Sequence, residues 1–228
     1  MKTGRACPPA LVRRPPMRAR AELLLAACGA ALLAGCSGTL LPKPAAAPAR
    51  HTLDTGAPVP GAAAPPAGAP VLVVALPRAA PGHDSRRMVY LRQAQQLEAF
   101  AFHEWVEPPA AMLAPLLVVA LQHGGAFRAV LLAPSAVAGT WRLETEQVRL
   151  QQDFSTRPSQ VRLSLRAVLL DASQRQVIAW REFDTRVAAA SDDPAAGVVA
   201  AGQATQRLLA AVADFCAGHV RRGVPVLP

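Results

Sequence analysis

The sequence predicts an α+β fold, an antiparallel sheet meander packed against two main helices in two layers, behind a signal peptide and a Pro/Ala-rich tether. Four strand-like stretches lie between residues 127 and 187, two other stretches keep helical spacing, and residues 37–70 are mostly Pro, Ala and Gly. With 228 residues, the chain has room for one domain with a real core. We expect a signal peptide at 1–35, a tether at 36–70, the domain at 71–220 and a tail at 221–228.

The N-terminal segment predicts export. An apolar run, Leu23–Leu33, follows four arginines and is too short to span a bilayer permanently, as in a secretory signal. The run ends in Leu33-Ala34-Gly35-Cys36, which resembles the lipobox of bacterial lipoproteins: a branched residue, two small residues and the acceptor cysteine. Small residues let a membrane peptidase approach the backbone before Cys36. The alternative is an ordinary signal peptide or first transmembrane helix with an incidental cysteine.

The lipobox resemblance implies a diacylglycerol thioether on Cys36, cleavage before it, and a fatty acyl chain such as palmitate on the new amino group. Three chains anchor a protein firmly, since each buried methylene contributes about 0.8 kcal/mol. Met17 is a second candidate start, because residues 17–36 form a complete lipoprotein signal. By the sorting rule for lipoproteins, Ser37 implies delivery to the periplasmic face of the outer membrane.

Residues 37–70 hold eight prolines in 34 positions and cannot bury enough surface to offset the cost of ordering. They predict an extended, semi-rigid tether. One strand-like island, His51–Asp54, interrupts the stretch, so the tract 56–70 could instead be a long loop inside the domain.

The first half of the predicted domain alternates short strands with one helix. The continuous apolar run Val71–Leu76 is typical of a strand buried on both faces. A second short strand is expected at Met88–Tyr90, and residues 91–106 fit both helical and alternating patterns. A helix should then begin at Pro108-Pro109, contain a kink at Pro115 and stop at Gly124-Gly125.

The second half predicts four strands and a long helix. The strands are Phe127–Leu132, Trp141–Leu150, Val161–Leu170 and Gln176–Val187, with polar turn residues 171–174 predicting a hairpin between the last two. Alternation is clearest in the third strand, in which every second residue from Val161 to Leu169 is apolar. Ser191-Asp192-Asp193-Pro194 then predicts a helix start, with apolar spacing continuing to Phe215.

Charge and cysteine usage exclude several function classes. The net charge is +9, but after Cys36 only 18 basic residues face 14 acidic ones, without a basic cluster, so we expect no nucleic-acid partner. Cys216 lies in an apolar helical stretch, so we expect its side chain to be buried as a small apolar group.

Two short motifs that contain catalytic or metal-binding residue types have simpler interpretations. His83-Asp84-Ser85 predicts a turn, since three adjacent residues cannot form a catalytic triad. The segment from His103 to Glu107 lacks the second histidine of a zinc helix, so we expect neither enzyme activity nor a metal or other cofactor.

The order of several motifs resembles the ABC-type transport auxiliary lipoproteins, the Pqi C-type component. The resemblance runs from about residue 51 to 218 and rests most on Tyr90 followed by Trp105-Val106-Glu107-Pro108-Pro109 with Met112-Leu113. The remaining matches are Leu53-Asp54, Arg87-Met88-Val89, Phe127 to Leu131, Arg162 to Leu165, Phe183 and the last helix.

The resemblance implies a non-enzymatic partner of a Mce-type lipid transport system. Its ATPase, permease and Mce-domain subunits would sit at the inner membrane, with this lipoprotein docking them at the outer membrane. Tyr90, Trp105, Pro108 and Pro109 are candidate partner or groove contacts, although large aromatics at such a junction are also typical core anchors. A structural lipoprotein of envelope assembly remains an alternative, and a lipid-anchored hydrolase is a third.

Overall fold

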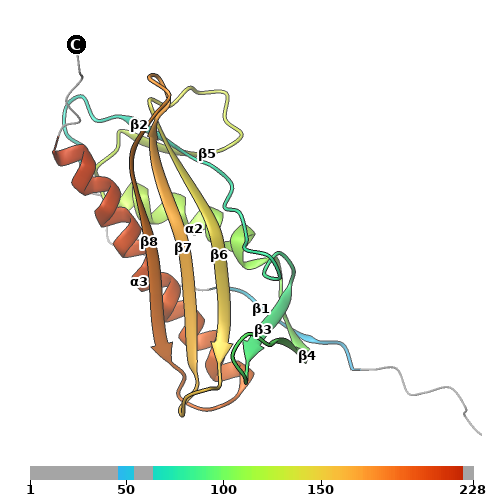
Figure 1. The fold of residues 1–228 in the computed structure, drawn as a ribbon. Helices are drawn as coiled ribbons and strands as arrows, with labels where there is room; N and C mark the ends of the chain where they lie inside the picture. Colours follow the sequence, from blue (N-terminus) through green and yellow to red (C-terminus); the bar gives the residue numbers. More distant parts are fainter. Residues whose placement is uncertain (1–45, 54–63, 223–228) are drawn as a thin grey trace, which may run out of the picture. The chain divides into compact units, whose positions relative to one another are not determined.

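The computed structural model describes residues 46–53 and 64–222. Within these residues, eight strands form one mixed sheet, and two helices pack against one of its faces (Figure 1). The strands are β1 (Ala49–His51), β2 (Val71–Val74), β3 (Arg87–Leu91), β4 (Leu97–Trp105), β5 (Ala129–Leu132), β6 (Trp141–Asp153), β7 (Gln160–Asp171) and β8 (Gln176–Ala188), and the helices are α2 (Pro109–His123) and α3 (Pro194–Arg221). The predicted α+β class is therefore confirmed. Cys36, Asp54 and most of the predicted tail lie outside the described residues.

The antiparallel meander is formed by β6, β7 and β8, as the sequence predicts. In β7 the alternate residues from Val161 to Leu169 are all buried, each 2% exposed or less, and face the helices. The turn between β7 and β8 is held by Asp171, whose carboxylate accepts hydrogen bonds from the Ser173 hydroxyl and from the backbone N–H groups of Ser173 and Gln174. These bonds lower the pKa of Asp171.

The remaining strands join the meander mostly in parallel, where the sequence led us to expect antiparallel pairing. β2 lies between β5 and β6 and is parallel to both, and β3 runs parallel to the far end of β6. One edge of the long strand β6 is therefore shared by two short partners, with a single bridge from Ala79 to Val148 between them. Leu72 and Val74, on one face of β2, are fully buried. On the other face Val71 is buried but Val73 is half-buried, and Leu76 beyond the strand is 58% exposed, so the predicted burial of Val71–Leu76 on both faces is only partly met.

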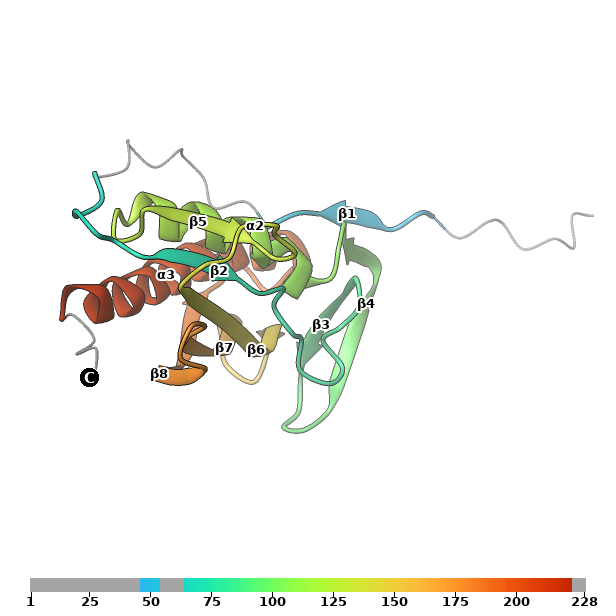
Figure 2. The same ribbon diagram turned by 90° about the horizontal axis from the view of Figure 1, so that it is seen from above.

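Residues 97–105, which fitted two patterns, form strand β4. It pairs antiparallel with β3 and, on its other edge, parallel with β1. Figure 2 shows this group of β1, β3 and β4 to one side of β6. Met88 and Trp105 of the group line a small pocket together with Gly197, so the group lies beside the start of α3. The island predicted near His51 is thus part of the sheet, although the strand comprises only Ala49–His51.

Both predicted helices are present. α2 begins at Pro109, contains Pro115 and ends at His123, after which Gly125 adopts a φ of 62° in the left-handed region that favours glycine. α3 begins after Asp193, whose side chain accepts a hydrogen bond of 2.9 Å from the backbone N–H of Ala196. Of the helices described here, neither is long and apolar enough to cross a membrane.

A buried polar contact joins the sheet to the start of α3. The Gln152 amide donates to the Ser159 hydroxyl at 2.9 Å and to the Asp193 carbonyl at 3.3 Å. The backbone N–H of Ser159 in turn donates to the Asp192 carboxylate at 2.7 Å. A Cβ on Gly197 would lie 2.2 Å from Oε1 of Gln152, so this side chain packs directly on the helix backbone. The sequence analysis missed this contact.

Candidate functional site

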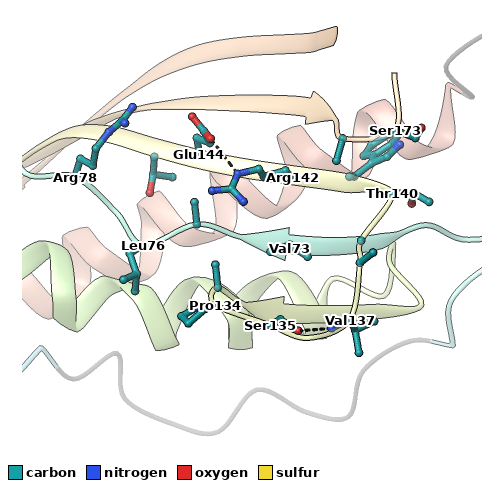
Figure 3. Close-up of a pocket in the computed structure, with 17 residues that line it drawn as sticks. Val73, Leu76, Arg78, Pro134, Ser135, Val137, Thr140, Arg142, Glu144 and Ser173 are labelled. Atoms are coloured by element: carbon teal, nitrogen blue, oxygen red, sulfur yellow. Dashed lines mark hydrogen bonds and ion pairs between the residues drawn. The ribbon is translucent and has the colours of Figure 1, made fainter. Parts of the chain in front are cut away.

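An open hollow of about 920 Å³ lies where β2, the β5–β6 loop and the start of β6 meet (Figure 3). Val73 and Arg142 are register partners in its wall, while their neighbours Leu72 and Leu143 are buried in the core under the helices. The hollow therefore opens on the face of the sheet that α2 and α3 leave uncovered. Its volume is in the range of small-molecule and peptide sites.

The loop beside the hollow is held close to β2 by its sequence. A Cβ on Gly139 would lie 2.6 Å from Cγ2 of Val73 and 3.0 Å from the carbonyl oxygen of Val71, so only glycine allows this approach. The Thr140 carbonyl accepts a hydrogen bond of 2.8 Å from the backbone N–H of Ala172. These contacts fix the loop against the sheet on one side and the β7–β8 turn on the other.

The charged side chains at the rim of the hollow form ion pairs of opposite charge. Nε of Arg142 donates to Glu144 at 3.0 Å, and the guanidinium of Arg78 donates to Glu146 at 2.7 Å. All four side chains are at least a quarter exposed, so each pair contributes little to the free energy of unfolding. The rim consequently carries no strong unpaired charge of either sign.

Most of the residues that line the hollow are apolar. Leu76 and Val137 are 58% and 57% exposed, which is unusual for large aliphatic side chains lying close to the same opening. The lining residues with hydroxyl groups are Ser135, Thr140, Thr145 and Ser173, and none of the lining residues is a histidine or cysteine. The lining thus offers no serine paired with an imidazole base, and its chemistry favours contact with an apolar segment.

The structure places the predicted contact residues elsewhere, around β3, β4 and the start of α2. Tyr90 and Trp105 are 7% and 3% exposed. The Tyr90 hydroxyl donates to Glu98 at 2.9 Å, and burial together with this bond raises the pKa of Tyr90. Pro108 precedes α2 and is half-buried, while Pro109 opens the helix and is buried. None of the four lines the hollow, and a role for them in partner contact remains a prediction.

Two histidines that are 52 positions apart in the sequence meet where β1 pairs with β4. Nε2 of His51 and Nδ1 of His103 lie 3.0 Å apart, and the two rings are stacked with centroids 5.3 Å apart. Burial and the neighbouring His103 lower the pKa of His51. No local signal in the sequence brings these two histidines together, because the parallel pairing of a three-residue strand joins segments far apart in the chain.

The other residues that the sequence offered as catalytic or metal-binding candidates have structural surroundings. His83 lies in a turn region and is buried, and the segment from His103 continues strand β4 and is not helical. Cys216 is fully buried in α3, as predicted, and burial raises the pKa of its thiol to about 12. In the described ranges, no three His, Cys, Asp or Glu side chains gather closely enough to hold a metal ion.

The fold and these residues can be compared with known proteins. The family described as ABC-type transport auxiliary lipoprotein component matches residues 51–213, which is most of the chain. The chain belongs to this family. The matched range of this auxiliary lipoprotein contains the tyrosine and the Trp-x-x-Pro-Pro motif that suggested the resemblance. No relative is found among curated protein sequences.

Two solved structures share the fold of the auxiliary lipoprotein. The crystal structure of protein XCC0632 from Xanthomonas campestris is 24% identical, with 77% of this chain and 95% of that chain covered and a TM-score of 0.63. A second crystal structure, of an uncharacterised protein, is 16% identical, with 75% of this chain and 99% of that chain covered and a TM-score of 0.56. At these identities the likeness establishes the fold alone.

Proposed function

We propose that this auxiliary lipoprotein is a non-catalytic periplasmic subunit of a Mce-associated, ABC-type lipid transport system, which it docks at the outer membrane. Lipid on Cys36 would hold it to the membrane, and its partners would be the Mce-domain, permease and ATPase subunits. The observation that carries the proposal is the family match over residues 51–213. Energy for transport would come from the ATPase, since the sequence has no Gly-rich phosphate-binding loop followed by Lys and Ser or Thr.

The open face of the sheet supports a role in contact with a partner protein. Leu76 and Val137 are more than half exposed beside the hollow, and exposed apolar patches mark interaction sites. The charges on the rim are already paired with one another, so binding there would gain mainly from burial of apolar surface. A lipid-anchored domain would also meet its partners at high local concentration.

The experiment is capture of partners from membranes with the tagged full-length chain, after mild cross-linking and detergent extraction. Val137→Asp places a charge in the hollow, and Val199→Asp places the same charge on α3, where Val199 is 64% exposed. We expect Mce-domain or permease subunits with the wild type and Val199→Asp. We expect at least tenfold less of them with Val137→Asp, because a carboxylate would have to be desolvated in the contact.

Each other result would reject a stated part of the proposal. Capture of envelope-assembly proteins alone would reject the transport role and favour the structural lipoprotein. Equal capture by the two aspartate variants would reject the hollow as the contact surface while leaving the transport role in place. Labelling of the wild-type chain by a serine-directed hydrolase probe would reject the non-catalytic role.

A further inference from the structure

Strand β1 is attached to the rest of the molecule by few contacts. Its three residues pair only with β4, in the register Ala49 to His103, Arg50 to Glu104 and His51 to Trp105. The first two residues are exposed and the third is half-buried, so little apolar burial holds the strand. Beyond β1, Leu53 is 5% exposed and belongs to the core, so it fixes the chain just after the strand.

Three polar contacts accompany the pairing of β1 with β4. The His51 carbonyl accepts a hydrogen bond of 2.8 Å from the backbone N–H of Val106. Nε of Arg50 donates to Glu104 at 2.9 Å, but Arg50 is 65% exposed and this ion pair is weak. The third contact, between the imidazoles of His51 and His103, is partly buried, so it adds to the backbone pairing that holds β1 on the sheet.

This imidazole contact depends on protonation. A hydrogen bond between Nε2 of His51 and Nδ1 of His103 needs a proton on one nitrogen and a lone pair on the other. One added proton preserves the bond, because the second ring still accepts. Two added protons remove it, since both facing nitrogens then carry hydrogen and the two positive rings have their centroids 5.3 Å apart. The ring planes are nearly parallel, 15° apart, so the two N–H groups would point toward each other.

The groups around the pair modify this repulsion without removing it. Glu104 lies next to His103 in β4 but is paired with Arg50, whose positive charge lies on the same strand as His51. From α3, the Asp193 carboxylate has its pKa lowered by the Ser191 hydroxyl, by the Ala196 N–H and, least, by His103. The edge of the Phe100 ring faces His103 with centroids 6.2 Å apart and adds no charge.

We propose that His51 and His103 form a pH-sensitive clasp that holds β1 on β4 at neutral pH and releases it on acidification. The inference is independent of the proposed transport role. Its direction follows from linkage, because the docked strand binds fewer protons than the released strand, so docking weakens as pH falls below the ordinary histidine value of about 6.5. Release of three extended residues would lengthen the chain before Leu53 by about 10 Å.

The test is hydrogen exchange of the full-length chain in detergent, read at the Val106 amide that the His51 carbonyl protects. After correction for the intrinsic pH dependence of exchange, we expect protection at Val106 to fall about tenfold between pH 7.5 and 5, because the released strand binds a proton that the docked strand does not. Amides in the middle of β7, such as Leu165, serve as the reference for intact global structure. Equal protection of Val106 at the two pH values would overturn the clasp.

Two variants separate the imidazole pair from its neighbours. In His103→Gln the amide can still bond His51 but cannot gain a charge, so the fall in protection of Val106 between the two pH values should be clearly smaller than in the wild type. The part that remains comes from burial of His51, the larger cause of its lowered pKa. In Glu104→Gln the carboxylate is lost while the imidazoles stay, so the tenfold fall should persist. A tenfold fall in His103→Gln, or its loss in Glu104→Gln, would assign the pH response to other groups and overturn the proposal.

Discussion

At the scale of single residues, two glycines of α3 have opposite surroundings. Gly197 touches the buried amide of Gln152, whereas a Cβ on Gly218 would be in ordinary contact with the Arg222 side chain at 3.7 Å. The helix itself favours alanine at both positions, by up to about 1 kcal/mol. The difference between the effects of alanine substitution at these two positions therefore measures the contact between the sheet and the start of the helix.

We predict that Gly197→Ala lowers the free energy of unfolding by about 1–3 kcal/mol, because Gln152 must leave its hydrogen bonds to Ser159 and Asp193. Gly218→Ala should instead raise it by up to about 1 kcal/mol. Urea unfolding followed by circular dichroism measures both changes. Equal effects of the two substitutions would show that Gln152 does not press on the helix.

Cys216 provides a second prediction at this scale. Because its thiol is fully buried and its pKa is raised to about 12, almost no thiolate is available to react at pH 8. We expect a maleimide or disulfide reagent to leave the Cys216 peptide unmodified in the native protein and to modify it fully in urea. Mass spectrometry of that peptide gives the result, and rapid native labelling would contradict the burial.

At the scale of elements, the hairpin of β7 and β8 carries a charged ladder on its uncovered face. Arg162 donates to Asp184 across the strands, at 2.9 Å from Nε, and Arg186 lies 3.7 Å from the same carboxylate. The cation of Arg166 lies over the ring of Trp180, which is 58% exposed. Arg162, Arg166 and Arg186 alternate with apolar residues in the sequence, as expected for the solvent-facing side of a half-buried sheet, and they lie on the uncovered face. Arg181 follows the same sequence pattern but is the register partner of the buried Ala167, so it lies on the side of the helices.

We predict that the ionised Asp184 makes a small, pH-dependent contribution to the free energy of unfolding. The Arg162 guanidinium lowers the pKa of Asp184, so the native state keeps the carboxylate charged to lower pH than the unfolded chain does. The contribution is complete above the ordinary carboxyl pKa of about 4 and is lost as pH falls through the lowered value. Asp184→Asn should cost about 0.5 kcal/mol at pH 7, since both side chains are more than a third exposed, and nothing at pH 2. Chemical unfolding at the two pH values tests the difference.

Elements with a local signal could be predicted, and contacts between distant segments could not. The alternation of β7, the turn at Asp171 and the Asp193-Pro194 helix start are all readable in a short window of sequence. The parallel partners of β2 and β1 are not, because strand pairing at long separation depends on the whole fold. The hollow was missed for the same reason, since it forms where Leu76, after β2, meets Val137 and Arg142 from the stretch leading into β6.

At the scale of the whole molecule, the anchor remains a prediction, since Cys36 lies outside the described residues. We expect the N-terminal peptide of the wild type to begin at Cys36 and to carry the mass of the acyl chains, and that of Cys36→Ser to carry no acyl mass, because the thioether forms on the Cys36 thiol. Cys28→Ser is the matched control, since Cys28 lies in the segment expected to be removed, and it should leave the acylated peptide unchanged. Mass spectrometry of the N-terminal peptide gives the result. A wild-type chain that keeps residues before Cys36 and carries no acyl mass would favour a spanning segment over a lipid anchor.

The position of β1 in the chain determines how the molecule would respond to mechanical load on its N-terminal side. Tension applied to the chain before Ala49 would first load β1, which pairs only with β4 among the described strands. After β1 separates, the load would pass along the chain to Leu53, which is 5% exposed in the core, and beyond it to β2, which pairs with β5 and β6. The weakly held strand would therefore yield first, and the buried Leu53 would resist the load before it reached the part of the sheet under the helices.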